Sequence, residues 1–291
     1  MLLSINWYNI SIVHDIINII NSLWKLLFNA YIKISILGSE LMEHLENLDL
    51  YQKMINELRP FEGEMLKQIK DFYRIGLTWT SNALEGNSLT ESETKVLIED
   101  GLTVGGRPLR DMFEAIDHAK AYDYIFTLLR NNEIIEGNIL YLHKLFYQNI
   151  DEQFAGKYRN IPVFISGSNY PVSKKENIQS EMQDLCEWIK LERKQYHPVE
   201  FAALLHKKFV FIHPFKDGNG RVARLLMNAA LIQDGFLPAL IPPILRNEYI
   251  SLLEKAHKND SPFINFITER ELESQKDFLR LLHIPLPKMQ Q

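Results

Sequence analysis

The sequence is nearly devoid of cysteine, and Cys186 is the only one in 291 residues. A single cysteine excludes an internal disulfide framework. It lies in the segment MQDLCEWIKL, whose helical pattern predicts a buried, unreactive thiol. A chain without disulfides is typical of a reducing compartment, so we expect a cytoplasmic protein.

The chain also lacks an excess of positive charge and a long apolar run. Its formal net charge is −5 at pH 7, with a pI near 6.0, so no general basic field attracts nucleic acid and we expect no nucleic-acid partner. A membrane-spanning helix needs about 18 consecutive apolar residues. Asp15, Lys25 and Lys33 interrupt the most apolar stretch, and we therefore expect no membrane association.

Residues 1–41 form an N-terminal extension of uncertain role. The first 37 residues are rich in Ile, Leu and Asn and lack the basic n-region and cleavage site of a signal peptide. Three interpretations stay open: an extra packing helix, an interfacial anchor, or sequence upstream of the true start. The third is slightly favoured, because a regular polar helical pattern begins at Met42.

Apolar residues recur at helical spacing through most of the remaining chain. Thr90 with Glu93 predicts a capping box at a helix N-terminus, and Gly101 a helix stop. Segment 156–175 instead combines β-branched and aromatic residues with a Gly-Ser-Asn turn, which predicts a short β-hairpin. The sequence thus predicts an all-α fold with one hairpin, its helices beginning near Pro60 and covering about 107–130, 136–149, 174–194, 198–213, 219–234, 246–258 and 262–283.

The segment HPFKDGNGRVAR, from His213 to Arg224, concentrates chemically useful residues. Gly218, Asn219 and Gly220 lie between two predicted helices, where flexible backbone can turn successive N–H groups toward an anion. The N-terminus of the following helix adds further N–H groups and a positive dipole end. Arg221 and Arg224 add two planar guanidinium groups, which suit a polyphosphate better than a single phosphate.

An acid and a base complete this segment. Asp217 is its only carboxylate, and one carboxylate together with substrate oxygens is a common Mg²⁺ arrangement. His213 can accept a proton at neutral pH and could deprotonate an incoming hydroxyl. Phe215 is expected to turn inward and hold the loop on the core.

Three other interpretations of the segment are weaker. GNGRVA matches the dinucleotide-binding fingerprint, but a helix rather than a strand precedes it. A zinc pair of His213 and Asp217 lacks further ligands at metal-like spacing. A purely structural helix–turn–helix elbow explains any one of these residues but not their combination.

The segment resembles the signature H-x-F-x-[D/E]-G-N-G-R-x-x-R of Fic domains at every fixed position, and the resemblance covers about 75–283. The chain is most similar to Fic AMP-transferases that carry their own inhibitory helix. The resemblance implies a Fic fold, a helical bundle with one β-hairpin flap. It places N-terminal helices with the inhibitory motif at 42–106, the Fic core at 107–283 and a tail at 284–291.

The resemblance implies transfer of AMP from ATP to a Tyr, Thr or Ser hydroxyl of a target protein, with release of pyrophosphate. His213 would be the base, and Asp217 would hold Mg²⁺, or Mn²⁺, at the phosphates. The Gly218–Arg221 backbone and Arg224 would bind the phosphates. The residues by themselves do not distinguish AMP transfer from phosphorylation.

Two further segments gain a role from the resemblance. Residues Val163, Phe164, Ile165 and Ser166 would belong to a flap that clamps the acceptor segment by strand addition. SNALEG, residues 81–86, fits the inhibitory pattern [S/T]-x-x-x-E-[G/N] through Ser81, Glu85 and Gly86. Glu85 would pair with Arg224 and take the place of the γ-phosphate.

Near the nucleotide, the chain departs from its relatives. They often carry two tyrosines near adenine, whereas Tyr249 is followed by Ile250, and His257 stands where an asparagine is common. Some relatives use CMP-containing donors, so these positions leave the base open. Relatives often form homodimers, and the resemblance extends that expectation here. Three alternative functions stay open. The protein could remove AMP, could both add and remove it, or could be a nucleotide-binding regulatory or toxin-like interaction protein.

Overall fold

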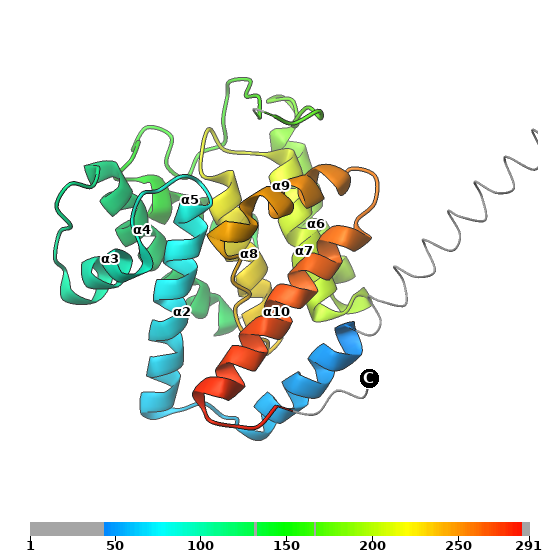
Figure 1. The fold of residues 1–291 in the computed structure, drawn as a ribbon. Coiled ribbons are helices and arrows are strands. Elements are labelled where there is room, and N and C mark those ends of the chain that lie inside the picture. Colours follow the sequence, from blue (N-terminus) through cyan, green and yellow to red (C-terminus); the bar gives the residue numbers. More distant parts are fainter. Residues whose placement is uncertain (1–43, 131–132, 166, 287–291) are drawn as a thin grey trace, which may run out of the picture. The chain divides into compact units, whose positions relative to one another are not determined.

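The computed structural model describes residues 44–130, 133–165 and 167–286, and every regular element in these ranges is helical (Figure 1). The all-α prediction is therefore confirmed. The predictions for residues 1–41 and for Ser166 lie outside the described residues. The boundary predicted between 42–106 and 107–283 stays a prediction.

The helices follow the apolar periodicity closely. The helix expected from about 174 begins later, at Ile178, and the others agree to within a few residues. The described elements are the helical residues 44–57, α2 (Gly63–Ala83), α3 (Glu91–Lys95) with the π-helical turn η1 (Val96–Asp100), α4 (Leu109–Ile125) with the 3₁₀ turn η2 (Phe126–Arg130), α5 (Glu136–Tyr147), α6 (Ile178–Glu192) with η3 (Arg193–Gln195), α7 (Pro198–Ile212), α8 (Asn219–Gln233), η4 (Pro243–Leu245), α9 (Arg246–Lys255) and α10 (Ser261–Leu281).

Local signals in the sequence set several helix ends. The Thr90 hydroxyl accepts a hydrogen bond from the Glu93 amide at 3.2 Å, and the Glu93 carboxylate accepts one from the Thr90 amide at 2.8 Å, so the predicted capping box is formed. Gly101 ends η1 in the left-handed conformation. Pro198 occupies the first turn of α7, where no amide donor is needed.

Helix α8 lies in the middle of this bundle. Its residues are buried on almost every side, which is the pattern of a central helix rather than a surface helix. Helix α7 packs along α8, α10 crosses α7, and α2 packs against α4, which in turn packs on α5 (Figure 1). The loop 213–218 joins α7 to α8 and therefore begins and ends in the core.

The predicted hairpin at 156–175 is wrong. None of the described residues of this segment is in a β-strand. The Arg159 guanidinium donates to the carbonyls of Ile161 at 3.0 Å and Ser173 at 2.5 Å, so it occupies acceptors that strand pairing would need. Pro162 and Pro171 lack amide donors. The two limbs of the segment instead enclose a hollow of about 710 Å³.

The environment of the single cysteine agrees in part with its sequence context. Cys186 lies on α6 and is half-buried rather than fully buried, and burial raises the pKa of its thiol to about 11. The thiol form therefore prevails at neutral pH, as expected for an unreactive cysteine. In the part of the chain that the structure describes, every helix is too short or too polar to cross a membrane.

Buried histidines predict a loss of stability in mild acid. Burial lowers the pKa of His118 to about 3, of His143 to about 4 and of His206 to about 3. Below pH 6.5 the unfolded chain takes up protons at these sites while the folded chain does not. Each histidine then costs up to about 1.4 kcal/mol per pH unit until its folded pKa is reached.

The unfolding free energy from urea titrations should therefore fall between pH 7 and pH 5. The variant His206→Gln, compared at both pH values, should show a smaller fall than the unchanged protein. A free energy that stays constant across this range would contradict the assignment of neutral, buried histidines.

Candidate active site

The loop from His213 to Gly218 turns the chain from α7 into α8. His213 ends α7 with a φ of 53°, and its amide donates to the Phe209 carbonyl at 3.1 Å. Gly218 has a φ of 79°, and a Cβ there would lie 2.7 Å from the Phe146 ring. Conformation and close packing both demand glycine at this position.

Interactions within the loop hold its shape without a ligand. Phe215 is fully buried, as expected, and its ring stacks on His143 with centroids 3.7 Å apart. The Asn219 side chain exchanges two hydrogen bonds of 2.9 Å with the Phe215 backbone. The amide side chain of Asn219 is thus committed to the loop, and only its backbone can face a ligand.

His143 fixes the loop from α5. Its Nδ1 accepts from the Gly156 amide at 2.9 Å, so its proton is on Nε2, which donates to the Asp217 carbonyl at 3.2 Å. Sequence reasoning missed His143, because its role depends on a contact across the fold.

His213 lies at the wall of a cavity beside the loop. Burial lowers the pKa of its imidazole to about 4; Arg159 lowers it further, whereas the Val210 carbonyl, Glu85 and Asp217 act in the opposite direction. No hydrogen bond of normal geometry reaches its Nδ1. The ring is therefore neutral at pH 7 and can accept a proton.

The two arginines of the loop diverge, although their spacing placed them on one helix face. Arg224 is 2% exposed and turns toward α2 and α9. Its Nε donates to Ser81 Oγ at 2.9 Å, and its Nη2 donates to the Ser81 carbonyl at 2.9 Å and to Glu85 Oε1 at 2.7 Å. Its Nη1 donates to the Tyr249 hydroxyl at 3.3 Å. The ion pair expected between Glu85 and Arg224 is formed.

Glu85 follows the end of α2 and carries an ionised carboxylate that lies beside the first turn of α8. Burial raises the pKa of Glu85, but attraction to Arg224 and Arg221 outweighs burial, and the pKa is lower than usual. A Cβ on Gly220 would lie 2.3 Å from Glu85 Oε1. The bare backbone of Gly220 therefore lets this carboxylate approach, and Gly86 ends the motif with a φ of 93°.

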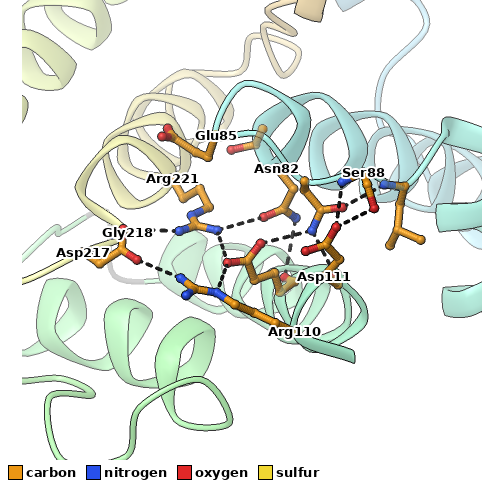
Figure 2. A network of polar contacts seen from close by, with 12 residues as sticks. Asn82, Glu85, Ser88, Arg110, Asp111, Asp217, Gly218 and Arg221 are labelled. Carbon is orange, nitrogen blue, oxygen red and sulfur yellow. Dashed lines mark hydrogen bonds and ion pairs between the residues drawn. The ribbon is translucent and has the colours of Figure 1, made fainter. Parts of the chain in front are cut away.

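Arg221 joins a second polar cluster beside Asp217 (Figure 2). Its Nη1 lies 3.1 Å from Glu114 Oε1, and its Nη2 lies 3.5 Å from Asp217 Oδ1. Arg110, from the first turn of α4, bridges the same two acids: Nε to Glu114 Oε1 at 3.1 Å and Nη2 to Asp217 Oδ2 at 3.1 Å. Sequence reasoning missed Arg110 and Glu114; their spacing of four on a helix was the only signal.

A cavity of about 170 Å³ opens beside the loop and is lined by Glu85, His213, Gly220, Arg224 and Tyr249. Tyr249 is 2% exposed, and its hydroxyl also lies 2.9 Å from His206 Nε2. His257 stacks between Tyr170 and Phe211, with both centroid distances 3.8 Å. Of the predicted nucleotide residues, Gly220, Arg224, Tyr249 and His257 line this cavity. Asp217, Gly218, Asn219 and Arg221 are not among its lining residues.

The predicted flap residues have different environments. The side chain of Phe164 is 93% exposed and that of Ile165 is 38% exposed, while Val163 is partly buried. Arg159 ties this segment to the loop, because its Nε donates to the His213 carbonyl at 2.8 Å.

The donor set around Asp217 fits a cation that arrives with a substrate. Among the described residues, no group of three or more His, Cys, Asp or Glu side chains could hold a metal. Asp217 supplies one half-exposed carboxylate. Mg²⁺ commonly binds one or two carboxylates together with substrate phosphates and waters, so the residues fit such a metal.

Solved structures with the same arrangement of helices define the class of this domain. Fic-1 from C. elegans matches with a TM-score of 0.75 and 27% identity, over 86% of this chain and 73% of that chain. A Fic domain containing signaling protein from Bacteroides thetaiotaomicron matches with a TM-score of 0.74 and 28% identity, over 84% of this chain and 100% of that chain. The fold is the Fic fold.

Sequence comparison agrees with this class. Residues 133–231 match the Fic/DOC family, and the chain thus carries a domain of that family. It is 34% identical to "Protein adenylyltransferase Fic" of Nematostella vectensis, over 80% of this chain and 55% of that protein. The match to the protein of that name in Drosophila melanogaster is 32%, over 79% and 47%. The chain therefore spans about half the length of the curated relatives it matches.

Ser81 should contribute to stability through Arg224. The variant Ser81→Ala removes the acceptor of Arg224 Nε, which is buried, and an unpaired buried donor costs about 1–3 kcal/mol. Urea unfolding should show a loss of that size, whereas Ser251→Ala, on the exposed face of α9, should be nearly neutral. Equal stability of the two variants would mean that the Ser81 hydroxyl is not a required partner.

Proposed function

We propose that this chain is an autoinhibited protein adenylyltransferase that transfers AMP from ATP to a Tyr, Thr or Ser hydroxyl of a target protein. The observation that carries the proposal is the neutral His213 beside the backbone of Gly218–Gly220 at the N-terminus of α8. A base next to an anion-binding helix end is suited to the attack of a hydroxyl on a phosphate. The names of the curated relatives support the choice of AMP as the transferred group.

The reaction divides between the residues of the loop. His213 accepts the proton of the acceptor hydroxyl while its oxygen forms a bond to the α-phosphorus of ATP. The bond from that phosphorus to the bridging oxygen breaks, and pyrophosphate leaves. The amides at the start of α8 stabilise charge on the phosphate oxygens. Asp217 would hold Mg²⁺ or Mn²⁺, which supplies further charge stabilisation when bound.

Glu85 accounts for the inhibited state. Its carboxylate occupies Arg224 Nη2 at 2.7 Å, the group expected to bind the γ-phosphate. A polyphosphate in the same place would meet a negative charge and would find no free guanidinium. ATP can then bind productively only when Glu85 leaves Arg224.

The acceptor is expected at the segment that carries Val163, Phe164 and Ile165. Phe164 is almost fully exposed, and its neighbour Ile165 lines the same cavity as His213. Exposed apolar residues of this kind suit an extended peptide. Ser166 belongs to the same prediction. Homodimer formation and a cytoplasmic location stay predictions.

Removal of AMP is the second candidate function. Glu85 and His213 line the same cavity, and Glu85 is ionised. An ionised carboxylate there could position a water against an AMP-modified residue. In that case Glu85 would be required for activity rather than opposed to it.

Labelled ATP tests the proposal directly. The variant Glu85→Gly, incubated with α-³²P ATP and lysate, should label protein strongly. The double variant Glu85→Gly/His213→Ala should lose that label, because the base is missing while the phosphate site is intact. If Glu85→Gly binds nucleotide but labels no protein, the result would favour a regulator. If a premodified target loses its label only when Glu85 is present, the result would favour AMP removal.

Glu85 and Arg224 should respond differently, although both belong to one ion pair. Glu85→Gly frees Arg224 and should raise the transfer rate. Arg224→Ala also breaks the pair but deletes the phosphate partner and leaves the buried site without its cation, so it should not activate. The transfer rate and thermal midpoint of both variants and their combination decide this. If Glu85→Gly is less stable and no more active, the pair is structural.

A further inference from the structure

Each oxygen of the Asp217 carboxylate already has a partner without any ligand, although the side chain is 43% exposed. Its Oδ1 accepts from the Gly218 amide at 2.7 Å and lies 3.5 Å from Arg221 Nη2. Its Oδ2 accepts from Arg110 Nη2 at 3.1 Å. A cation that approaches Oδ2 therefore competes with Arg110 for this oxygen.

Arg110 is the partner that can be displaced. Its side chain is 58% exposed, at the start of α4, whereas that of Arg221 is 3% exposed and fixed over the Phe146 ring. Arg110 reaches the loop from a distant part of the chain (Figure 2). It can leave toward solvent without opening the core.

The charges of this cluster are balanced. Arg110 and Arg221 face Asp217 and Glu114, so two positive groups meet two negative groups. A divalent cation that enters alone adds charge to two nearby guanidinium groups, which repel it. A cation that enters with a polyphosphate brings compensating negative charge.

We propose that Arg110 is a positioning residue that holds Asp217 Oδ2 in the nucleotide-free protein and competes there with a free divalent cation. Arg110 keeps the carboxylate directed toward the site and weakens the binding of metal that arrives without a nucleotide. When a metal–nucleotide complex binds, Arg110 releases Oδ2 and the metal takes its place. This inference rests on the proposed role of Asp217 in metal binding.

Mn²⁺ binding measured by electron paramagnetic resonance tests the proposal without reference to activity. Without nucleotide, Arg110→Gln should bind Mn²⁺ about three- to fivefold tighter than the unchanged protein, because an exposed ion pair worth up to about 1 kcal/mol no longer competes. Arg110→Lys keeps the charge and should bind Mn²⁺ like the unchanged protein. With α,β-methylene ATP present, the phosphates offer Arg110 another anionic partner, so the advantage of Arg110→Gln over the unchanged protein should shrink.

Arg107→Gln is the matched control. Arg107 pairs with Glu93 at 2.8 Å, in the same part of the chain, and its side chain is 30% exposed. Its loss should leave Mn²⁺ affinity unchanged, which separates a local effect from a general change in charge. Urea midpoints of the four proteins check that each is folded.

Asp217→Asn separates this inference from the proposed function. If Arg110→Gln binds Mn²⁺ like the unchanged protein while Asp217→Asn loses nucleotide-dependent Mn²⁺ binding, the role of Arg110 is refuted and the metal site stands. If Asp217→Asn binds Mn²⁺ with nucleotide as tightly as the unchanged protein, both the metal site and the inference fail.

Discussion

The burial of the Arg224 guanidinium is the constraint around which this domain is organised. A charge that is 2% exposed must be paired and hydrogen-bonded, or it costs several kcal/mol. Its partners are Ser81 of α2, Glu85 just after the end of α2, and Tyr249 of α9. Tyr249 in turn contacts His206 of α7. Arg224 of α8 thus links α2 to α9 directly and to α7 through Tyr249, and Ser81, Asn82 and Leu84 of the segment SNALEG belong to the core.

Without a ligand, the charged side chains around Arg224 and Asp217 all have a partner of opposite charge. Arg224 has Glu85, and Arg221 and Arg110 share Glu114 and Asp217. The folded chain therefore pairs each of these charged side chains with an opposite charge without a ligand. An anionic ligand must replace some of these contacts, so its binding free energy is smaller than the new contacts alone would give.

Most of the fold could be predicted from the sequence, because apolar spacing reports a helix wherever one face is buried. The capping box at Thr90 and the residue pattern of the His213 loop could also be predicted, because both depend on residues that are close in the sequence. Segment 156–175 was predicted wrongly, since Arg159 takes the backbone carbonyls that its pattern would have paired. Arg110 was missed because its contact with Asp217 joins positions 107 residues apart. Such a contact depends on how α4 packs beside α8, which no local pattern records.

Arg159 anchors the segment that follows it through backbone atoms alone. Its three side-chain partners, at His213, Ile161 and Ser173, are all backbone carbonyls. The anchor therefore requires no particular side chain at either end of the exposed stretch between Ile161 and Ser173. Exposed positions of that stretch such as Phe164 can change in sequence while the His213 carbonyl stays bound to the same guanidinium. Variation at such exposed positions leaves the anchor of the segment, and the position of the His213 backbone, unchanged.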